Sequence, residues 1–275
     1  MNNEQNIAFI GGGNMAAALI GGMRERGVAA ERIRVVERDT ERGAALAARF
    51  EVAVSTEIDD AVRACDVIVL AVKPQQMRTA VAPLAGLSPR QCVMSVAAGV
   101  RVADLSRWLG GHAAVVRAMP NTPALVGAGM TGLYAPAAVD ATGREAAAAV
   151  MLAVGEILWV DNEAAIDAYT AIAGSGPAYV FHFIEALESA AQNMGFDAPS
   201  ARRLAVGTVH GAARLAATAD DAPAVLRERV TSPGGTTAAA LEVFAQAEFV
   251  EIVARAANAA RARAMELGEE LGRGA

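Results

Sequence analysis

With 275 residues, of which 54% are hydrophobic and 4% aromatic, the chain is long enough for two domains, and its net charge of −6 excludes the basic surface that binds nucleic acid. Its two cysteines are too few for a disulfide framework, and neither they nor the three histidines have the spacing of metal ligands, so we expect no metal site. No uncharged run reaches the roughly 18 residues of a membrane span, and we expect a soluble, cytoplasmic protein that does not enter a membrane.

The chain opens with a short apolar run, a glycine-rich loop and a helical stretch. Residues 7–10 predict a buried parallel strand and residues 17–26 a helix, and the loop between them fits the pattern G-x-G-x-x-G/A. In that pattern Gly11 permits a tight turn, Gly13 lets the backbone approach a pyrophosphate, and Ala16 lets helix and strand pack closely. Because a strand precedes the loop and a helix follows it, we predict a dinucleotide site rather than a merely structural turn.

A charged segment follows the second predicted strand, residues 33–36. An acidic residue at this place usually accepts a hydrogen bond from the ribose 2′-OH of NAD, whereas an arginine accommodates the 2′-phosphate of NADP. The chain has both kinds of residue: Arg38 and Arg42 favour the phosphate, and Glu37 would repel it if it faced the site. A solvated loop is the alternative interpretation of these charges. We expect NADPH as the cofactor, with NADH as the alternative.

Strands and helices alternate over the first 161 residues. Further strands are predicted over residues 52–54, 66–72, 91–96, 114–119, 129–134 and 157–160, and helices over residues 40–49, 57–64, 75–85, 101–109 and 140–154. This alternation predicts an α/β fold with a doubly wound, Rossmann-type sheet that is parallel at first. The later strands are close together in the chain, and we expect an antiparallel edge among them. We assign residues 1–161 to this dinucleotide-binding domain.

Three loops stand at the carboxyl ends of predicted strands, where open α/β sheets bind ligands. Among 24 lysines and arginines, Lys73 is the only lysine, and it follows the strand at residues 66–72. The small side chains of residues 96–98 would let a flat ring approach, and residues 119–123, MPNTP, predict a rigid turn that carries an amide and a hydroxyl. Each of the last two loops is equally well interpreted as a simple turn.

After residue 162 no convincing strand follows. Helices are predicted over residues 163–173, 177–194, 199–217, 222–230, 235–247 and 249–271. Alanine-rich helices over residues 162–275 make a thin core on their own, so we expect them to form an all-helical dimerisation and substrate domain that pairs with a second copy of the chain.

A short turn of residues 232–237, SPGGTT, directly precedes a strongly helical run. The turn leaves backbone N–H groups free, and the following helix offers the positive end of its dipole to a carboxylate or phosphate. Thr236 and Thr237 place hydroxyl groups in the first turn of that helix. The alternative interpretation is an ordinary helix N-cap, in which proline and glycine only form the turn before the helix.

In their order and spacing these motifs resemble those of the pyrroline-5-carboxylate reductase family over essentially the whole chain. The motifs are GGGNMA at residues 11–16, AVKP at 71–74, AAG at 97–99, MPNTP at 119–123, GSGPAY at 174–179 and VTSPGGTT at 230–237. The resemblance implies hydride transfer from NADPH to the C=N bond of 1-pyrroline-5-carboxylate, which gives L-proline in the final step of proline biosynthesis. It also implies a Rossmann domain followed by a helical dimerisation domain, and often a ring of dimers.

The resemblance further implies roles for particular residues. The NADPH site would be formed by Ile10, Gly11, Gly12, Gly13, Asn14, Met15, Ala71, Val72, Lys73, Pro74, Val96, Ala97 and Ala98, with Arg38 near the 2′-phosphate. The substrate carboxylate would be held by Ser232 and the backbone of Gly234, Gly235 and Thr236, and Thr237 would be the catalytic residue that bonds the ring nitrogen. The chain departs from the family at Ile58, where members often have an asparagine that touches the adenosine.

Three other functions are alternatives to this one. A β-hydroxyacid dehydrogenase would carry a lysine on the helix after the domain junction, and residues 177–194 contain none. A reductase of another cyclic imine would use the same site, and a non-catalytic NADP(H)-binding regulator would not need the complete SPGGTT motif. His182 lies among apolar residues of a predicted helix, so we expect a core histidine there.

Overall fold

The computed structural model describes residues 5–273. These residues fall into two compact units. Unit 1 contains the residues up to Ser175 together with those from Ala260 onward, and unit 2 contains Gly176–Ala259. The domain boundary that we expect between residues 161 and 162 is a different division of the chain and stays a prediction.

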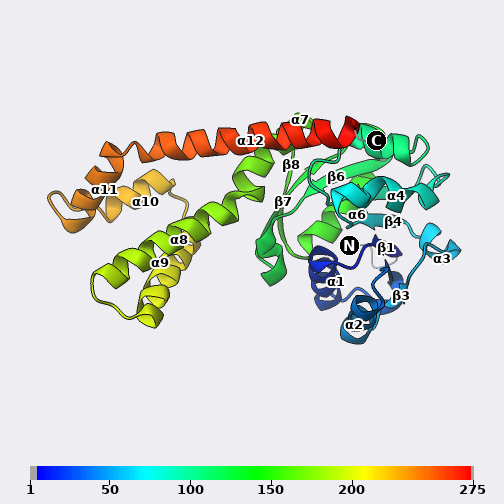
Figure 1. Cartoon of the computed structure of the whole chain (residues 1–275), viewed down its shortest axis with the longest axis horizontal. Helices are drawn as coiled ribbons and strands as arrows, with labels where there is room; N and C mark the ends of the chain where they lie inside the picture. The colour runs from blue at the N-terminus through cyan, green and yellow to red at the C-terminus, as the bar shows by residue number, and fades with distance from the viewer. Residues whose placement is uncertain (1–4, 274–275) are drawn as a thin grey trace. The chain divides into compact units, whose positions relative to one another are not determined.

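Unit 1 is built on an eight-stranded sheet with the strand order β3-β2-β1-β4-β5-β6-β7-β8 (Figure 1). The strands are β1 (Ile7–Ile10), β2 (Ile33–Val36), β3 (Ala53–Ser55), β4 (Val67–Leu70), β5 (Cys92–Ser95), β6 (Val115–Met119), β7 (Gly129–Tyr134) and β8 (Gly155–Trp159). The first six run parallel, β7 is antiparallel to β6, and β8 is parallel to β7. This confirms the predicted doubly wound sheet and its antiparallel edge.

The central strands β1 and β4 are apolar throughout because both faces of the sheet are covered there. Ile7 and Phe9 of β1 belong to the apolar cluster on one face, and Ala8 and Ile10 belong to the cluster on the other. All four side chains are buried. Successive residues of a strand point to opposite faces, so a continuous apolar run is what this position in the sheet requires.

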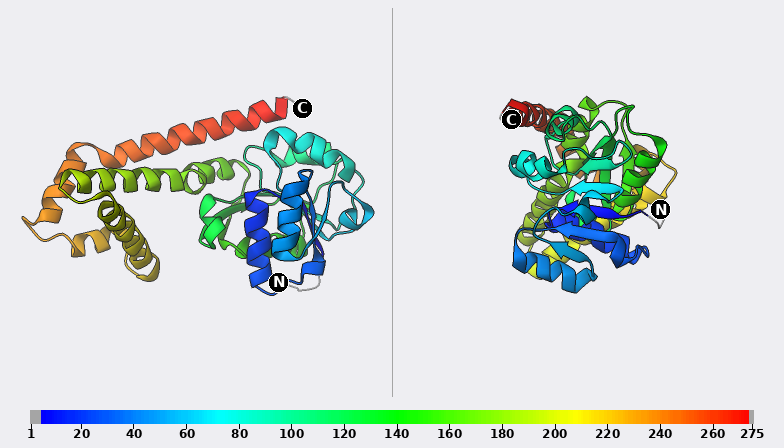
Figure 2. Two further views of the ribbon diagram at one scale, coloured as in Figure 1. Left: turned by 60° about the horizontal axis from the view of Figure 1, so that its bottom comes forward. Right: turned by 90° about the vertical axis from the view of Figure 1, so that its right-hand side faces the viewer.

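Helices cover the two faces of this sheet. The helices of unit 1 are α1 (Asn14–Glu25), α2 (Thr40–Phe50), α3 (Asp60–Arg63), α4 (Met77–Val81), α5 (Val102–Trp108), α6 (Ala141–Leu152) and α7 (Ala164–Tyr169), and the end of α12 (Phe249–Arg273) belongs to the same unit. Residues of α1, α2 and α6 share one apolar cluster, and residues of α3, α4 and α5 share the other. Helices α1 and α2 lie side by side (Figure 2).

Two predicted helices differ in detail from those observed. The helix predicted over residues 75–85 breaks into a 3₁₀ turn (Pro74–Gln76), α4 and a second 3₁₀ turn (Ala82–Leu84). The α-helical pattern ends after Val81 because Pro83 has no N–H group to continue it. The helix predicted over residues 163–173 ends as α-helix at Tyr169 and continues as the π-helix Thr170–Gly174. Single π-helical turns are rare and occur often at functional sites.

The end of α12 approaches α5 closely through small residues. A Cβ atom on Gly268 would lie 3.0 Å from Nε of Arg101, and one on Gly272 would lie 3.0 Å from a carboxylate oxygen of Asp104. Between them, Leu271 packs against the apolar cluster of α3, α4 and α5. Glycine at two positions one helical turn apart therefore lets α12 complete this face of unit 1.

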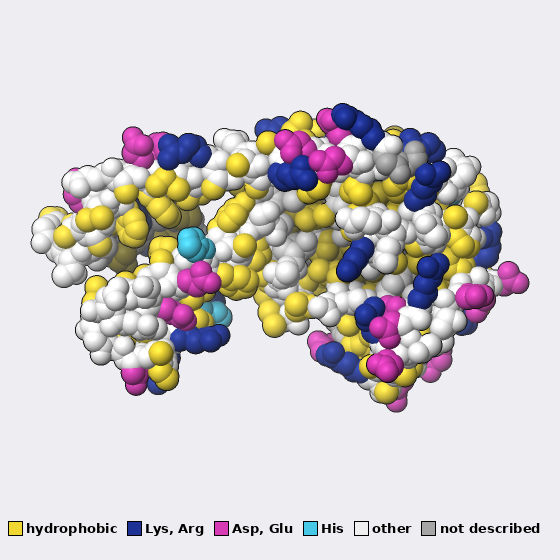
Figure 3. Space-filling view, viewed as in Figure 1, with side chains coloured by type: hydrophobic (Ala, Val, Ile, Leu, Met, Phe, Trp, Pro, Cys, Tyr) yellow, Lys and Arg dark blue, Asp and Glu magenta, His cyan; other side chains and the backbone are white. Residues whose placement is uncertain are grey.

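Unit 2 is helical and leaves its apolar side chains exposed. It consists of α8 (Gly176–Asn193), α9 (Ala198–Thr218), α10 (Pro223–Arg229), α11 (Thr236–Gln246) and the first part of α12. Among its described residues only Ala201 and Ala205 are buried, and Figure 3 shows part of its apolar surface in yellow. In the single chain 87% of the His182 side chain is exposed beside Glu185, so its own chain does not bury it, and the expected core histidine stays a prediction for the oligomer. The chain alone supplies no core here for that histidine to enter.

Candidate active site

The glycine-rich loop joins β1 to α1 and is shaped by its glycines. Gly11 has φ +100°, and a Cβ atom there would lie 2.8 Å from the carbonyl oxygen of Ala71, so only glycine fits. A Cβ atom on Gly13 would meet no atom within 4 Å, so the space beside it is open. Gly13 is the N-cap of α1, no side chain caps that helix, and its first turn has no acidic residue. These features fit the pyrophosphate of a dinucleotide.

The structure brings together the three segments predicted to line the cofactor site. Residues 10–15, 71–74 and 96–98 follow the adjacent strands β1, β4 and β5 at one edge of the sheet. The N–H of Ala71 donates to the carbonyl of Ile10 at 2.8 Å, and the N–H of Val96 donates to that of Leu70 at 3.1 Å. The strand order reverses between β1 and β4, which is where open α/β sheets bind their ligands.

Glu37 lies against the glycine-rich loop and is not part of a solvated loop. It is 8% exposed, and its carboxylate accepts hydrogen bonds from the N–H of Gly12 at 2.8 Å and the N–H of Asp39 at 2.9 Å. Arg42 adds an ion pair at 3.2 Å. Burial raises the pKa of Glu37, but the two N–H groups and Arg42 outweigh it, and the net pKa lies below its ordinary value. The carboxylate is therefore ionised at neutral pH.

The two arginines near Glu37 differ in how they are engaged. Arg42 pairs with Glu37 and also with Asp39 at 3.2 Å, and half of its side chain is exposed. Arg38 is exposed, and within residues 5–273 no hydrogen bond or ion pair engages its side chain. Lys73 is exposed as well, at the start of the 3₁₀ turn after β4. Ile58 packs against the apolar cluster of α3, α4 and α5.

The MPNTP loop holds the backbone of unit 1 together through Asn121. This side chain is 9% exposed; its amide donates to the carbonyl of Ala173 at 3.0 Å and accepts from the N–H of Met130 at 2.9 Å. Both ends of the amide are thus bonded to backbone, one of them in the π-helix. A Cβ atom on Gly174 would lie 3.0 Å from Cε of Met119, so this loop and the end of the π-helix are in contact.

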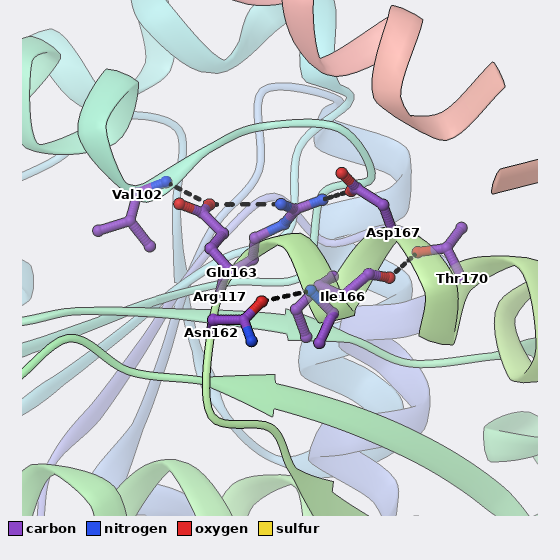
Figure 4. A network of polar contacts seen from close by, with 8 residues as sticks. Val102, Arg117, Asn162, Glu163, Ile166, Asp167 and Thr170 are labelled. Atoms are coloured by element: carbon purple, nitrogen blue, oxygen red, sulfur yellow. Dashed lines mark hydrogen bonds and ion pairs between the residues drawn. The ribbon is translucent and has the colours of Figure 1, made fainter. Parts of the chain in front are cut away.

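A buried ion network fixes the same region, and the sequence interpretation missed it (Figure 4). Arg117 of β6 pairs with Asp167 of α7 at 3.0 Å and with Glu163 at 3.3 Å. The Glu163 carboxylate also accepts from the N–H of Val102, the first residue of α5, at 2.8 Å. One guanidinium therefore joins β6, α7 and α5. The signal available was an arginine inside an otherwise apolar strand and two carboxylates four residues apart.

The SPGGTT turn forms the N-terminus of α11 in unit 2. Gly234 has φ +71°, the N–H of Gly235 donates to the carbonyl of Ser232 at 3.0 Å, and Gly235 is the helix N-cap. No side chain caps α11, and its first turn contains no acidic residue. The hydroxyl-bearing Thr236 is exposed and Thr237 is half-buried. The turn thus leaves helix N–H groups available beside two hydroxyls, as an anion site requires.

The two cysteine thiols are not activated, and the described residues include no metal-binding cluster. Burial raises the pKa of Cys65 to about 11 and that of Cys92 to about 12, so both thiols stay protonated. Within residues 5–273 no three His, Cys, Asp or Glu side chains are grouped as metal ligands would be. A search of the same residues for a helix long and apolar enough to cross a membrane found none.

Models of two protein families match the chain. Residues 163–267 match the one described as pyrroline-5-carboxylate reductase dimerisation, and residues 6–99 match the one described as NADP oxidoreductase, coenzyme F420-dependent. The fold and the glycine-rich loop thus define the class of protein: an oxidoreductase with a Rossmann-type dinucleotide domain.

Individual relatives cover nearly the whole chain. It is 48% identical to the pyrroline-5-carboxylate reductase of Pseudomonas aeruginosa over 97% of this chain and 98% of that protein. The solved structure of a pyrroline-5-carboxylate reductase from Coxiella burnetii has a TM-score of 0.91 at 39% identity and covers 96% of this chain and 98% of its own. The solved structure of Plasmodium falciparum pyrroline carboxylate reductase with NADP bound has a TM-score of 0.84 at 26% identity, and it covers 97% of this chain and 99% of its own. The chain belongs to the pyrroline-5-carboxylate reductase family, which confirms the predicted resemblance.

Proposed function

We propose that this chain reduces 1-pyrroline-5-carboxylate to L-proline with NADPH, the final step of proline biosynthesis, in the cytoplasm. The observation that carries this proposal is the SPGGTT turn at the N-terminus of α11, in a chain whose unit 1 has an open glycine-rich loop. The first feature suits a small carboxylate and the second suits a dinucleotide. Together they match the two reactants of the proposed reaction.

The cofactor would be held by the loops at the carboxyl edge of the sheet. Residues 10–15 would bind the pyrophosphate through backbone N–H groups and the N-terminus of α1, and residues 71–74 and 96–98 would flank the nicotinamide half. When bound, NADPH supplies the hydride, which is the cofactor's own chemistry. Arg38 would hold the 2′-phosphate.

The substrate would be oriented by α11. The backbone N–H groups of Gly234 and Thr236 and the hydroxyl of Ser232 would hold the carboxylate, and the helix dipole would favour its negative charge. Gly235, whose own N–H donates to the carbonyl of Ser232, would hold the turn in shape beside the carboxylate. The hydroxyl of Thr237 would bond the ring nitrogen. A cyclic imine is readily protonated, so the site needs orientation of the C=N bond more than it needs a strong acid.

Steady-state kinetics of the full chain test this proposal. We expect turnover of 1-pyrroline-5-carboxylate with NADPH, and slower turnover of a six-membered cyclic imine carboxylate. Faster turnover of the six-membered substrate would assign the chain to another cyclic imine. Binding of NADPH with no turnover of either imine would instead indicate a regulator.

The Arg38→Ala substitution should weaken the binding of NADPH more than the binding of NADH. The exposed guanidinium has no partner to lose within the described chain, so its removal affects only a ligand phosphate. A charge-assisted contact of this kind contributes about 1.5–3 kcal/mol, so KM for NADPH should rise about tenfold or more while KM for NADH stays near its original value. Equal losses for the two cofactors would remove Arg38 from the phosphate site.

The full chain should be at least a dimer in solution. The match to a dimerisation family over residues 163–267 supports a homo-oligomer, and the large apolar side chains exposed on unit 2 need cover. These include Tyr179, Phe181, Phe244, Val250 and Ile252. Light scattering at micromolar concentration should give at least twice the mass of one chain, and a ring of dimers would give a larger even multiple. A folded monomer at that concentration would contradict the proposal.

A further inference from the structure

The place of Glu37 bears on which nucleotide the chain prefers. Glu37 directly follows β2 and lies against the loop that connects β1 to α1. A Cβ atom on Gly12 would lie 3.1 Å from a Glu37 carboxylate oxygen, so carboxylate and loop are in contact. In Rossmann-type domains this is the position that meets the ribose 2′ substituent. The chain therefore holds a fixed negative charge where NADP(H) carries a phosphate.

The contacts of Glu37 also control Arg42. The guanidinium of Arg42 divides its donors between Glu37 and Asp39, both at 3.2 Å. Asp39 is itself fixed, because its side chain caps α2 by accepting from the N–H of Arg42 at 3.0 Å. Arg42 thus pairs with two carboxylates, so fewer of its N–H donors are available to a third anion than those of Arg38, which no described side chain engages. Half of its side chain is exposed, so it can turn once one carboxylate loses its charge.

We propose that Glu37 sets the cofactor preference of this chain, by opposing the 2′-phosphate of NADP(H) and by holding Arg42 away from it. Arg38 alone then favours the phosphate, and the chain accepts NADPH with a smaller advantage over NADH than its two arginines would give. Both effects of Glu37 act in the same direction. This inference rests on the proposed function for the identity of the cofactor.

Glu37→Gln removes the charge while it keeps the length of the side chain and one acceptor for the neighbouring N–H groups. The measurement is calorimetric titration of the full chain with adenosine 2′,5′-bisphosphate and with 5′-AMP, which differ only in the 2′-phosphate. We expect the ratio of the two affinities to shift about tenfold toward the bisphosphate. The control is Glu41→Gln, an equal change of charge on the exposed first turn of α2, which should leave the ratio within about twofold.

The same substitution is measured a second time in an Arg42→Met background. The double variant loses both members of the ion pair, so the comparison with Arg42→Met measures the charge of Glu37 without the release of Arg42. Here Glu37→Gln should still raise the ratio, but by only about threefold, since no arginine is released. If Glu37→Gln alone does not fold, the affinity ratio of the double variant is compared with that of Arg42→Met, and this comparison decides whether the inference holds.

An unchanged ratio in a folded Glu37→Gln variant would overturn the inference, as would an equal shift in the Glu41→Gln control. Failure of the wild-type chain to bind either nucleotide would overturn it together with the cofactor assignment. If nucleotides bind and the ratio shifts as expected, but no imine is reduced, the inference stands and only the proposed reaction fails.

Discussion

The Arg117→Met variant should lose about 3–5 kcal/mol of the free energy of unfolding. The Arg117 guanidinium is almost fully buried and pairs with Asp167 at 3.0 Å, a side chain that is itself only 9% exposed. Methionine fills most of the space, so the loss comes mainly from the carboxylate that stays buried without its partner. The measurement is denaturant unfolding at one fixed protein concentration, because the stability of an oligomer depends on concentration.

The matched control is Arg263→Met, which removes an arginine that also pairs with two carboxylates, Glu266 at 2.8 Å and Glu270 at 2.9 Å, but all three side chains are more than half exposed. An exposed pair contributes about 0–1 kcal/mol, so this variant should unfold close to the wild type. A second variant, Arg117→Met with Asp167→Leu, should recover part of the loss because both charges are gone. A loss below about 1 kcal/mol for Arg117→Met would mean that the network contributes little.

The Thr237→Val variant should lower kcat/KM for 1-pyrroline-5-carboxylate by about 5- to 150-fold. Valine keeps the shape and the β-branching of threonine, so α11 should still form. The variant removes one hydrogen bond and leaves the ring nitrogen poorly paired, which costs roughly 1–3 kcal/mol. The affinity for NADPH should barely change, because the SPGGTT turn is remote in the sequence from the glycine-rich loop that would hold the pyrophosphate.

Two controls accompany this variant. Thr236→Val makes the same substitution one residue earlier, where the side chain is exposed and the backbone N–H is retained, so activity should stay within about threefold of wild type. Ser232→Ala should also be milder than Thr237→Val, because backbone N–H groups share the carboxylate. Full activity in Thr237→Val would show that the helix N-terminus holds the substrate without that hydroxyl.

The sheet and the cofactor loops were predictable because their signals are local. Apolar runs of four residues, such as 7–10, follow from burial on both faces, and the glycine spacing at residues 11–16 follows from the turn geometry that Gly11 adopts. Because the carboxyl ends of parallel strands lie at the same edge of a sheet, the pattern of strands was enough to predict that the cofactor loops lie together. The break at Pro83 has a local signal as well, because proline cannot donate the N–H that an α-helix needs at that position.

What could not be predicted depends on contacts between distant residues. Arg117 lies 46 and 50 positions from its partners Glu163 and Asp167, and no local pattern pairs them. The orientation of Glu37 was open for the same reason, since its partner Gly12 is 25 positions away. The surroundings of His182 could not be predicted either, because the sequence cannot say whether an apolar helix is covered by its own chain or by another.

The packing of α12 on α5 also constrains when unit 1 can finish folding during synthesis. The strands and most helices of this unit leave the ribosome early, but Gly268, Leu271 and Gly272 are made about 160 residues after α5. At about 5–20 residues per second, this face of the nascent unit stays uncovered for on the order of 10 s or more. The part of the apolar cluster that Leu271 covers therefore faces solvent in the nascent chain until residues 260–273 are synthesised.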